Sequence, residues 1–470
     1  MLVSYHNLQL NNEPFIDGAN LYSVENSKLI TEFDGSYFKA QPHNIRDVLS
    51  GKESLSKLKS NDVVVSNMGG PYALAYHHIR DKKNLKFRII RDVQTSFWQG
   101  YFLQEKLCGP YTHEGDAVLF LSEFQRQLFI NLFPEHLNEE NTFVCAPFMH
   151  FFPKDLPKKE NDYDGLTLGW VGRVTSEKGF HIVLRSFIEI RKQLENVRLI
   201  VSGGRSPPKF EKWIISTLKK NQVPDNAIIR MNQGKFTPHL SVWDTYKKLD
   251  VFLFPSMSLN ESLGRVMIEA SYCKIPVIAA HYAAAPEILS PHNLIPVTYK
   301  KHLMQLSCAE NSGHVDQDEF TRRILEHKKL SNKTRIKNYE NHYLKYVNIL
   351  KGEQKKEKLT VLNSEIKKLI KGFKLYHDKP SISPELSFER LRKFMMNENY
   401  AILSLWHFYI PVYMGYNPYV LFFANNYHAS LERVRLKLQK GIMLAKNPIK
   451  SHFKKWYYVK RREFANKMGY

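Results

Sequence analysis

Short apolar runs alternate with helix-type segments through most of this 470-residue chain, and this alternation constrains its fold more than any other feature. Clear examples are residues 62–65, 87–90 and 117–121, and the run at 142–146 follows them. Strands that alternate with helices form parallel sheets, because each helix carries the chain back to start the next strand in the same direction. We therefore expect an α/β fold.

The chain is too long for one ordinary hydrophobic core, so we expect two or three domains. Their expected bounds are 1–152, 165–350 and 351–470, with the Pro-, Lys- and Asp-rich stretch 153–164 as the first linker. A content of 43% hydrophobic and 24% charged residues is typical of a globular protein. The four cysteines are scattered without metal-ligand spacing, which favours a reducing cytoplasm. The first residues lack a basic stretch followed by an apolar core, so we expect no cleaved signal.

A strand-type run ending in glycine leads into a basic loop at residues 168–179, LGWVGRVTSEKG. In it Arg173 and Lys178 stand five residues apart, before the helical run 181–190. Two cations at this spacing can converge on one pyrophosphate. When a sugar leaves a nucleoside diphosphate, negative charge grows on the phosphate, so fixed Arg and Lys donors stabilise the transition state more than the ground state. This chemistry requires no metal ion.

Two glutamates, Glu261 and Glu269, follow the apolar run 251–254 and precede the run 275–279. Cap-type residues around Glu261 predict the start of a helix, and Glu269 lies further along it. The N-terminus of such a helix, at the carboxyl edge of a parallel sheet, holds a diphosphate well. The loop carboxylate can accept hydrogen bonds from a hexose, and the helical one from a ribose. Either glutamate alone would be weak evidence, but the ordered combination with the basic loop is rare.

In this order of strands, basic loop and glutamates, the chain resembles the retaining glycosyltransferases of family 4. The likeness covers roughly residues 60–350 and is most specific from 168 to 290. It implies the GT-B fold, two Rossmann-like domains facing across a cleft, here with a mainly helical C-terminal extension. The resemblance implies a diphosphate clamp of Arg173 and Lys178, a sugar contact at Glu261 and a ribose ligand at Glu269. It also implies donor-binding backbone at Gly172, Ser262, Leu263 and Gly264.

The chain departs from the family pattern in four places. The family usually has Glu-Gly-Phe-Gly at residues 261–264 and a small-Gly-Gly segment at 283–285, where this chain has three alanines. The first 60 residues lack the usual apolar strand with its glycine-rich loop. A His-Asp pair is common after a first-domain strand, but Arg91 precedes Asp92 here. We therefore expect Arg91, Asp92 and His77 on the acceptor side. Asp162-Tyr163-Asp164 resembles an Asp-x-Asp metal motif, but its linker position predicts a solvated turn and no metal site.

The function implied is transfer of a hexose from a nucleotide-diphosphate sugar to a hydroxyl of a glycan or lipid-linked acceptor, with retained configuration and without a metal or cofactor. Such enzymes serve polysaccharide or lipopolysaccharide biosynthesis. Two alternatives stay open. The acceptor could be a protein or nucleic acid, or the chain could be a non-catalytic scaffold that keeps a nucleotide pocket.

The tail changes character sharply at residue 432. Residues 399–431 contain no charged side chain and are rich in aromatics, whereas 433–470 carry twelve Lys or Arg and one acid, half of the chain's formal net charge of +22. Aromatic rings followed by cations suit an anionic membrane surface, which predicts a cytoplasmic enzyme peripheral on the inner face of the membrane. Pro411 and Pro418 argue against a spanning helix. A helical subdomain packed on the core is the equal alternative, and nucleic-acid binding lacks any recognisable module.

Overall fold

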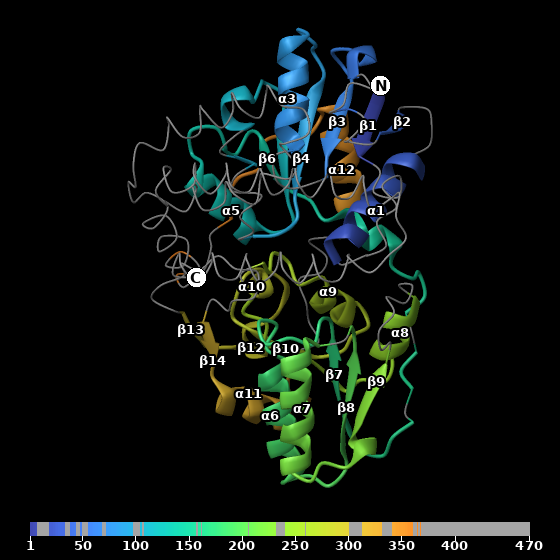
Figure 1. Ribbon diagram of the computed structural model, residues 1–470, viewed down its shortest axis with the longest axis vertical. Coiled ribbons are helices and arrows are strands. Elements are labelled where there is room, and N and C mark those ends of the chain that lie inside the picture. The colour runs from blue at the N-terminus through green and yellow to red at the C-terminus, as the bar shows by residue number, and fades with distance from the viewer. Residues whose placement is uncertain are drawn as a thin grey trace, which may run out of the picture.

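The computed structural model describes residues 1–6, 18–32, 38–43, 55–67, 72–96, 104–105, 108–156, 158–160, 162–204, 206–231, 240–258, 260–299, 313–330 and 341–360, and a few isolated positions. Figure 1 shows two sheets with their helices, one in the upper and one in the lower half of the view, and helices α9 and α10 between them. We call the two halves the first and second units.

The first unit is built around a six-stranded parallel sheet with the order β2-β1-β3-β4-β5-β6. Its elements are β1 Leu2–His6, α1 Gly18–Glu32, β2 Lys39–His43, η2 Leu55–Lys57, β3 Val63–Ser66, α3 Tyr72–Lys82, β4 Arg88–Val93, η3 Gly109–Tyr111, β5 Ala117–Phe120, α5 Glu123–Leu132, β6 Thr142–Val144 and η4 Pro147–Phe151. Its central strands β3 and β5 are buried along their whole length, as strands covered on both faces must be.

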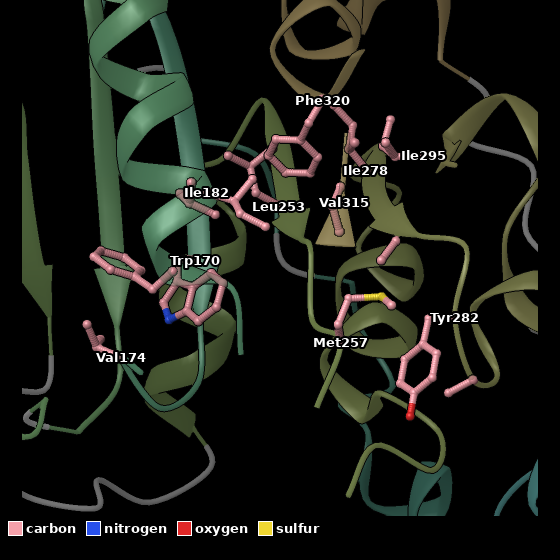
Figure 2. Packing of buried hydrophobic residues seen from close by; sticks show 14 of the residues in the cluster. Trp170, Val174, Ile182, Leu253, Met257, Ile278, Tyr282, Ile295, Val315 and Phe320 are labelled. Atoms are coloured by element: carbon pink, nitrogen blue, oxygen red, sulfur yellow. The ribbon is translucent and has the colours of Figure 1, made fainter. Parts of the chain in front are cut away.

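The second unit repeats the design with the strand order β12-β11-β10-β7-β8-β9, again all parallel. Its elements are β7 Leu166–Val171, α6 Phe180–Arg191, β8 Val197–Ser202, α7 Pro208–Lys220, η5 Asp225–Ala227, β9 Ile228–Met231, α8 Leu240–Tyr246, β10 Val251–Phe254, α9 Arg265–Tyr272, β11 Val277–Ala280, α10 Ala285–Ile288, η6 Pro291–Asn293, β12 Leu294–Ile295, β13 Val297–Tyr299, β14 Gly313–Val315, α11 Gln317–Leu325 and η7 His327–Lys329. Figure 2 shows Trp170, Leu253, Ile278 and Phe320 in its core.

The alternation of strands and helices expected from the sequence is confirmed, and with it the GT-B fold class. The two units also share apolar packing, since one cluster of buried residues runs from Phe120 and Phe124 of the first unit into the core of the second. The Phe124 ring lies 6.1 Å from that of Tyr282, centroid to centroid. Residues 361–470 lie outside the described part of the chain except for two positions, so the expected helical extension and its membrane contact stay predictions.

Helix α12 His342–Lys351 departs from the expected bounds, because it packs on the first unit although it follows the second in sequence. Tyr346, Val347, Ile349 and Leu350 join a buried cluster with strands β1 and β3. Arg88 of β4 donates hydrogen bonds to the carbonyls of Ile349 and Leu350, which the end of a helix leaves without helical partners. The end of the expected 165–350 domain therefore lies with residues 1–152 in space.

We expect Tyr346→Ala to lower the free energy of unfolding of the first unit by about 3 kcal/mol or more, because Tyr346 is 1% exposed and its loss leaves a cavity. Leu344→Ala on the same helix is the control, since Leu344 is 60% exposed and its loss should cost less than ~0.5 kcal/mol. Hydrogen exchange should speed up in β1, β3 and β4 in Tyr346→Ala. Faster exchange confined to β7–β9 would contradict this placement of α12.

Candidate donor site

The strand order of the second sheet alone indicates where the candidate site lies. In the second sheet the order reverses between β7 and β10, and ligands of open parallel sheets bind at the carboxyl ends of strands at such a point. The loop after β7 is the basic loop 172–179. The loop after β10 is the segment 255–264, which carries Glu261. Two segments that are more than seventy residues apart in sequence therefore meet at one edge of the sheet.

Gly179 lets these two loops lie against each other. Its φ of 85° is left-handed, and a Cβ atom there would lie 2.6 Å from the carbonyl oxygen of Pro255. Real Cβ atoms do not approach backbone that closely, so any other residue would push the basic loop away from the β10 loop. Helix α6 begins at the next residue, Phe180.

The close approach produces an ion pair between the side chain expected to bind phosphate and the side chain expected to bind the sugar. Lys178 Nζ donates to Glu261 Oε2 at 2.7 Å, and the Ser256 hydroxyl donates to the same oxygen at 3.0 Å. The side chains of Lys178 and Glu261 are 20% and 11% exposed. Lys178 has three N–H donors, so the bond to Glu261 leaves it the capacity to bind a further anion. Ser256 was not among the residues expected from the sequence.

Arg173 is not drawn into this pair. Its side chain is 56% exposed, and its Nη1 atom lies 3.3 Å from Oε1 of Glu177, four residues further along the same loop. An exposed pair of this kind contributes little stability, so the guanidinium can turn toward a ligand at small cost. The structure therefore places Lys178 in the site and Arg173 at its solvent-facing border. Gly172, the residue before Arg173, has a φ of 132°, and a Cβ atom there would have no neighbour within 4 Å.

Helix α9 begins at Arg265, three to five residues later than the cap-type residues 260–262 suggested. Gly264 is the N-cap residue, with a left-handed φ of 73°. The preceding residues make other contacts: the Ser262 hydroxyl donates to the carbonyl of Gln94 in the first unit at 2.8 Å. Leu263 is buried in the second core cluster. The segment 261–264 therefore lies at the contact between the units, beside the start of α9.

Glu269 lies one turn into α9 and is 3% exposed. Its Oε2 accepts a hydrogen bond from the Tyr246 hydroxyl at 2.9 Å, and its Oε1 accepts one from Arg265 Nε at 2.8 Å. These donors fix the orientation of the carboxylate. A carboxylate has about four lone-pair positions, so two protein donors still leave the capacity to bind ribose hydroxyls. The ribose role of Glu269 stays a prediction.

The alanine segment that replaces the family's glycines carries backbone strain. Ala283 has a left-handed φ of 50°, which is unfavourable for a residue with a Cβ atom. The strained turn is held from outside the second unit: the Glu287 carboxylate accepts the backbone N–H groups of Glu123 and Phe124 at 3.0 and 2.7 Å. These groups belong to the first turn of α5, where an anion is favoured. The Ser122 hydroxyl also donates to the carbonyl of Ser262 at 2.7 Å.

On the acceptor side, Arg91 and His77 are fully buried inside the first unit. Arg91 binds both carboxylate oxygens of Glu105, at 3.0 and 2.8 Å, and its Nη1 lies 3.1 Å from His77 Nε2. Burial and the Arg91 charge lower the pKa of His77 to about 3, so the ring is neutral at physiological pH. The acceptor-side role expected for Arg91 and His77 stays a prediction.

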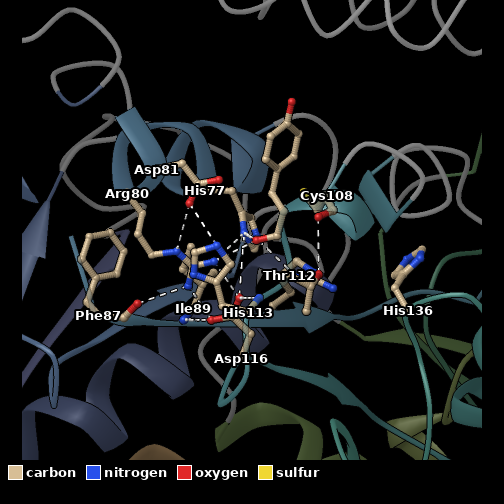
Figure 3. Close-up of polar contacts among 12 residues, drawn as sticks. His77, Arg80, Asp81, Phe87, Ile89, Cys108, Thr112, His113, Asp116 and His136 are labelled. Atoms are coloured by element: carbon tan, nitrogen blue, oxygen red, sulfur yellow. Dashed lines mark hydrogen bonds and ion pairs between the residues drawn. The ribbon is translucent and has the colours of Figure 1, made fainter. Parts of the chain in front are cut away.

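The same network extends along α3 to a second buried pair. Arg80 and Asp116 make two hydrogen bonds of 2.7 and 2.9 Å, and Figure 3 shows them beside His77. Asp116 also accepts the backbone N–H of Ile89 on β4. These contacts tie α3 to β4 and to the residues before β5, which is a structural role.

Asp92 lies at the end of β4, next to Arg91 in sequence but in a different environment. It is 1% exposed and accepts a hydrogen bond from Asn26 Nδ2 at 3.0 Å, while its other oxygen, Oδ1, has no hydrogen-bond partner. Burial raises the pKa of Asp92 to about 7, although the hydrogen bonds from Asn26 and Gln94 lower it. Its acceptor-side role stays a prediction.

The Asp-x-Asp stretch behaves as a turn with an ion pair. Asp162 binds the side chains of Arg198 and Lys248, which lower its pKa to about 2, and Arg198 lies over the Tyr163 ring at 4.4 Å. Within the described part of the chain, no three His, Cys, Asp or Glu side chains gather in a way that could hold a metal ion. Whether the chemistry needs a metal stays untested.

Comparison with known proteins agrees with this geometry. Residues 151–304 match the model of the family described as glycosyl transferases group 1. The matched segment, which is less than half of the chain, is similar to the group 1 glycosyltransferases. The chain is 29% identical over 143 residues to the capsular polysaccharide biosynthesis glycosyltransferase CapM of Staphylococcus aureus, covering 28% of this chain and 34% of that one. It is 25% identical over 150 residues to the phosphatidylinositol N-acetylglucosaminyltransferase GPI3 subunit of Saccharomyces cerevisiae (strain YJM789), covering 32% and 31%.

Among solved structures, sucrose-phosphate synthase from Thermosynechococcus elongatus resembles this chain over 74% of this chain's length and 98% of its own, with a TM-score of 0.50 and 13% identity. That likeness supports the fold alone. The sequence matches span about a third of the length of these curated relatives. The family model covers residues 151–304, which include the basic loop and the glutamate loop but no strand of the first sheet.

The raised pKa of Asp92 predicts that the stability of the folded chain depends on pH. The pKa of Asp92 is about 7 in the folded chain and ~4 in an unfolded one. The stability that Asp92 contributes is therefore fully present below pH ~4 and is lost as the pH rises through 7. We expect Asp92→Asn, which keeps the shape without the charge, to be more stable than the wild type at pH 8. Its advantage there should exceed that at pH 5.5 by ~2 kcal/mol.

Urea unfolding of both chains at the two pH values measures this difference. Asp155→Asn, at an exposed position in the segment between the units, is the control and should show no comparable dependence. An Asp92→Asn difference that is the same at pH 5.5 and pH 8 would mean that Asp92 keeps one protonation state over this range.

Proposed function

We propose that this protein transfers a hexose from a nucleotide-diphosphate sugar to a hydroxyl of a glycan or lipid-linked acceptor, with retained configuration and without a metal ion. The observation that carries the proposal is the pairing of Lys178 with Glu261 at the strand-order reversal of the second sheet, beside the N-terminus of α9. A phosphate-binding cation and a sugar-binding carboxylate are thereby held within one hydrogen bond of each other.

The donor is held by its diphosphate between Lys178, Arg173 and the start of α9. The exposed Arg173 closes onto the phosphates from the solvent side, since its Glu177 partner holds it only weakly. Because negative charge on the diphosphate grows as the glycosidic bond breaks, both cations stabilise the transition state more than the bound donor. Glu261 orients the hexose, and Glu269 the ribose.

Retention follows from attack on the same face as departure. The bond between the sugar's anomeric carbon and the phosphate oxygen breaks, and the acceptor oxygen forms its bond to that carbon. The acceptor's proton passes to the departing phosphate oxygen, so no enzyme nucleophile is required. This step relies on positioning by the two units rather than on a pair of carboxylates at hydrolase spacing.

The acceptor class is proposed from the relatives' names, since one acts in capsular polysaccharide biosynthesis and another is named for phosphatidylinositol. Both point to glycan or lipid-linked hydroxyls. No described helix is long and apolar enough to cross a membrane. Peripheral binding to the inner face of a membrane through residues 399–470, which lie outside the described part of the chain, is part of this proposal.

We expect Lys178→Ala to lower kcat/KM for sugar transfer roughly 10²- to 10³-fold, because it removes a charged donor to the developing diphosphate. Arg173→Ala should lower it less, since Arg173 is more exposed. Lys192→Ala is the matched control. Lys178 stands just before helix α6 and Lys192 just after it, where it pairs with Glu189 on the surface. This substitution should leave transfer unchanged.

Release of the nucleoside diphosphate from UDP-, GDP- and ADP-sugars, with and without glycan and lipid-linked acceptors, measures this directly. Full activity of Lys178→Ala would contradict the proposed clamp. Binding of a nucleotide without turnover of any sugar would favour the non-catalytic scaffold. Activity that EDTA abolishes would contradict metal independence.

A further inference from the structure

Arg265 joins the two units of the molecule. It is the first residue of α9, directly after Gly264. Its Nη1 and Nη2 donate to the two carboxylate oxygens of Glu25 at 2.5 and 3.0 Å, and Glu25 lies on α1 of the first unit. Its Nε donates to Glu269 of its own helix at 2.8 Å. One guanidinium therefore holds a carboxylate from each unit.

The arrangement is fixed as well as buried. The side chains of Arg265, Glu25 and Glu269 are 17%, 6% and 4% exposed. The guanidinium lies over the ring of Phe148 at 4.6 Å, in the segment that leaves the first sheet. Burial lowers the pKa of Arg265, but Glu269 and Glu25 outweigh this and raise it, so the group stays charged. Two-pronged binding with a third donor used elsewhere is geometry that only arginine provides.

Two other contacts between the units, among the described residues, involve different partners. Glu287 binds the first turn of α5, and Ser262 binds the carbonyl of Gln94, but neither contacts Glu269 in these bonds. Arg265 alone among these contacts touches both the first unit and Glu269. The orientation of Glu269 therefore depends on a guanidinium whose own position depends on Glu25.

We propose that Arg265 is a positioning residue that couples nucleotide binding at Glu269 to the closed arrangement of the two units through Glu25. The proposal rests on the proposed function, because it takes Glu269 as the ribose ligand. The Glu25 bonds exist only while the units are in contact, and they hold Arg265 where it orients Glu269. A nucleotide that binds the oriented carboxylate more tightly therefore favours the closed arrangement. By linkage, the loss of Glu25 lowers the affinity for the nucleotide.

The test uses the full chain and whichever of UDP, GDP and ADP binds the wild type. We expect Glu25→Gln to weaken that nucleotide about tenfold in a calorimetric titration, although Glu25 belongs to the other unit. Inorganic pyrophosphate, which has no ribose, should bind both chains equally. Small-angle scattering should show a larger radius of gyration for unliganded Glu25→Gln than for the wild type, and nucleotide should reduce this difference.

Two further variants separate coupling from simple loss of structure. Arg265→Lys keeps the charge but cannot bind in two prongs, so it should give the same loss, and adding Glu25→Gln to it should cost little more. Glu319→Gln, which breaks an exposed ion pair with Arg322 inside the second unit, is the control and should change neither affinity nor size. Glu25→Asp provides a milder change if Glu25→Gln does not fold.

The outcomes distinguish this proposal from the proposed function. Unchanged nucleotide affinity in Glu25→Gln, with normal binding by the wild type, overturns the coupling and leaves the donor site intact. Equal weakening of nucleotide and pyrophosphate overturns the role of Glu269 in the coupling. If the wild type binds none of the three nucleotides, the proposed function fails, and this proposal fails with it.

Discussion

The contact between the carboxyl edges of the two parallel sheets is the constraint on which the rest of the structure depends. Ser262, after β10, donates to the carbonyl of Gln94, after β4, and accepts from Ser122, after β5. Because every strand of a parallel sheet ends at the same edge, one contact of this kind gathers all the strand-end loops of both units. The basic loop, the glutamate loop and the start of α9 meet the first unit there without any long-range signal in the sequence.

Charged groups at this contact are stabilised by partners rather than by solvent. Lys178 faces Glu261, and Arg265 faces Glu25 and Glu269. Buried pairs of this kind add little net stability over apolar residues, but losing one partner is costly. Their use at the edge where a diphosphate is expected therefore favours a functional explanation. The buried Arg91–Glu105 pair lies inside the first unit and has a structural explanation instead.

The sequence predicted most of the fold, because buried parallel strands such as β3, β5 and β10 are continuous apolar runs. It did not predict the edge strand of the first sheet. Strand β2, with the sequence KAQPH, is polar and contains a proline, which is tolerated only at the edge of a sheet and leaves no apolar signal. Helix α12 could not be assigned to the first unit from the sequence. Its apolar positions predict that one face is buried, but they do not indicate which unit covers that face.

The candidate site divides in the same way. Lys178 and Glu261 could be found because each stands at a fixed distance from a recognisable strand, and the structure brings them together. The burial of Arg91 and His77 was not predicted, because burial of a charged side chain depends on distant partners such as Glu105, which no local pattern reveals. Arg265 stood inside a recognised motif, but its bond to Glu25 spans 240 residues and could be seen only in three dimensions.

A crystal structure of the full chain with its nucleoside diphosphate tests the central claim most directly. The account predicts that the diphosphate contacts Lys178 and the first turn of α9, that Arg173 has turned toward it, and that the ribose hydroxyls bind Glu269 while Arg265 keeps its bonds to Glu25. A nucleotide bound away from the carboxyl ends of β7 and β10, or one that leaves Lys178 paired only with Glu261, would contradict it.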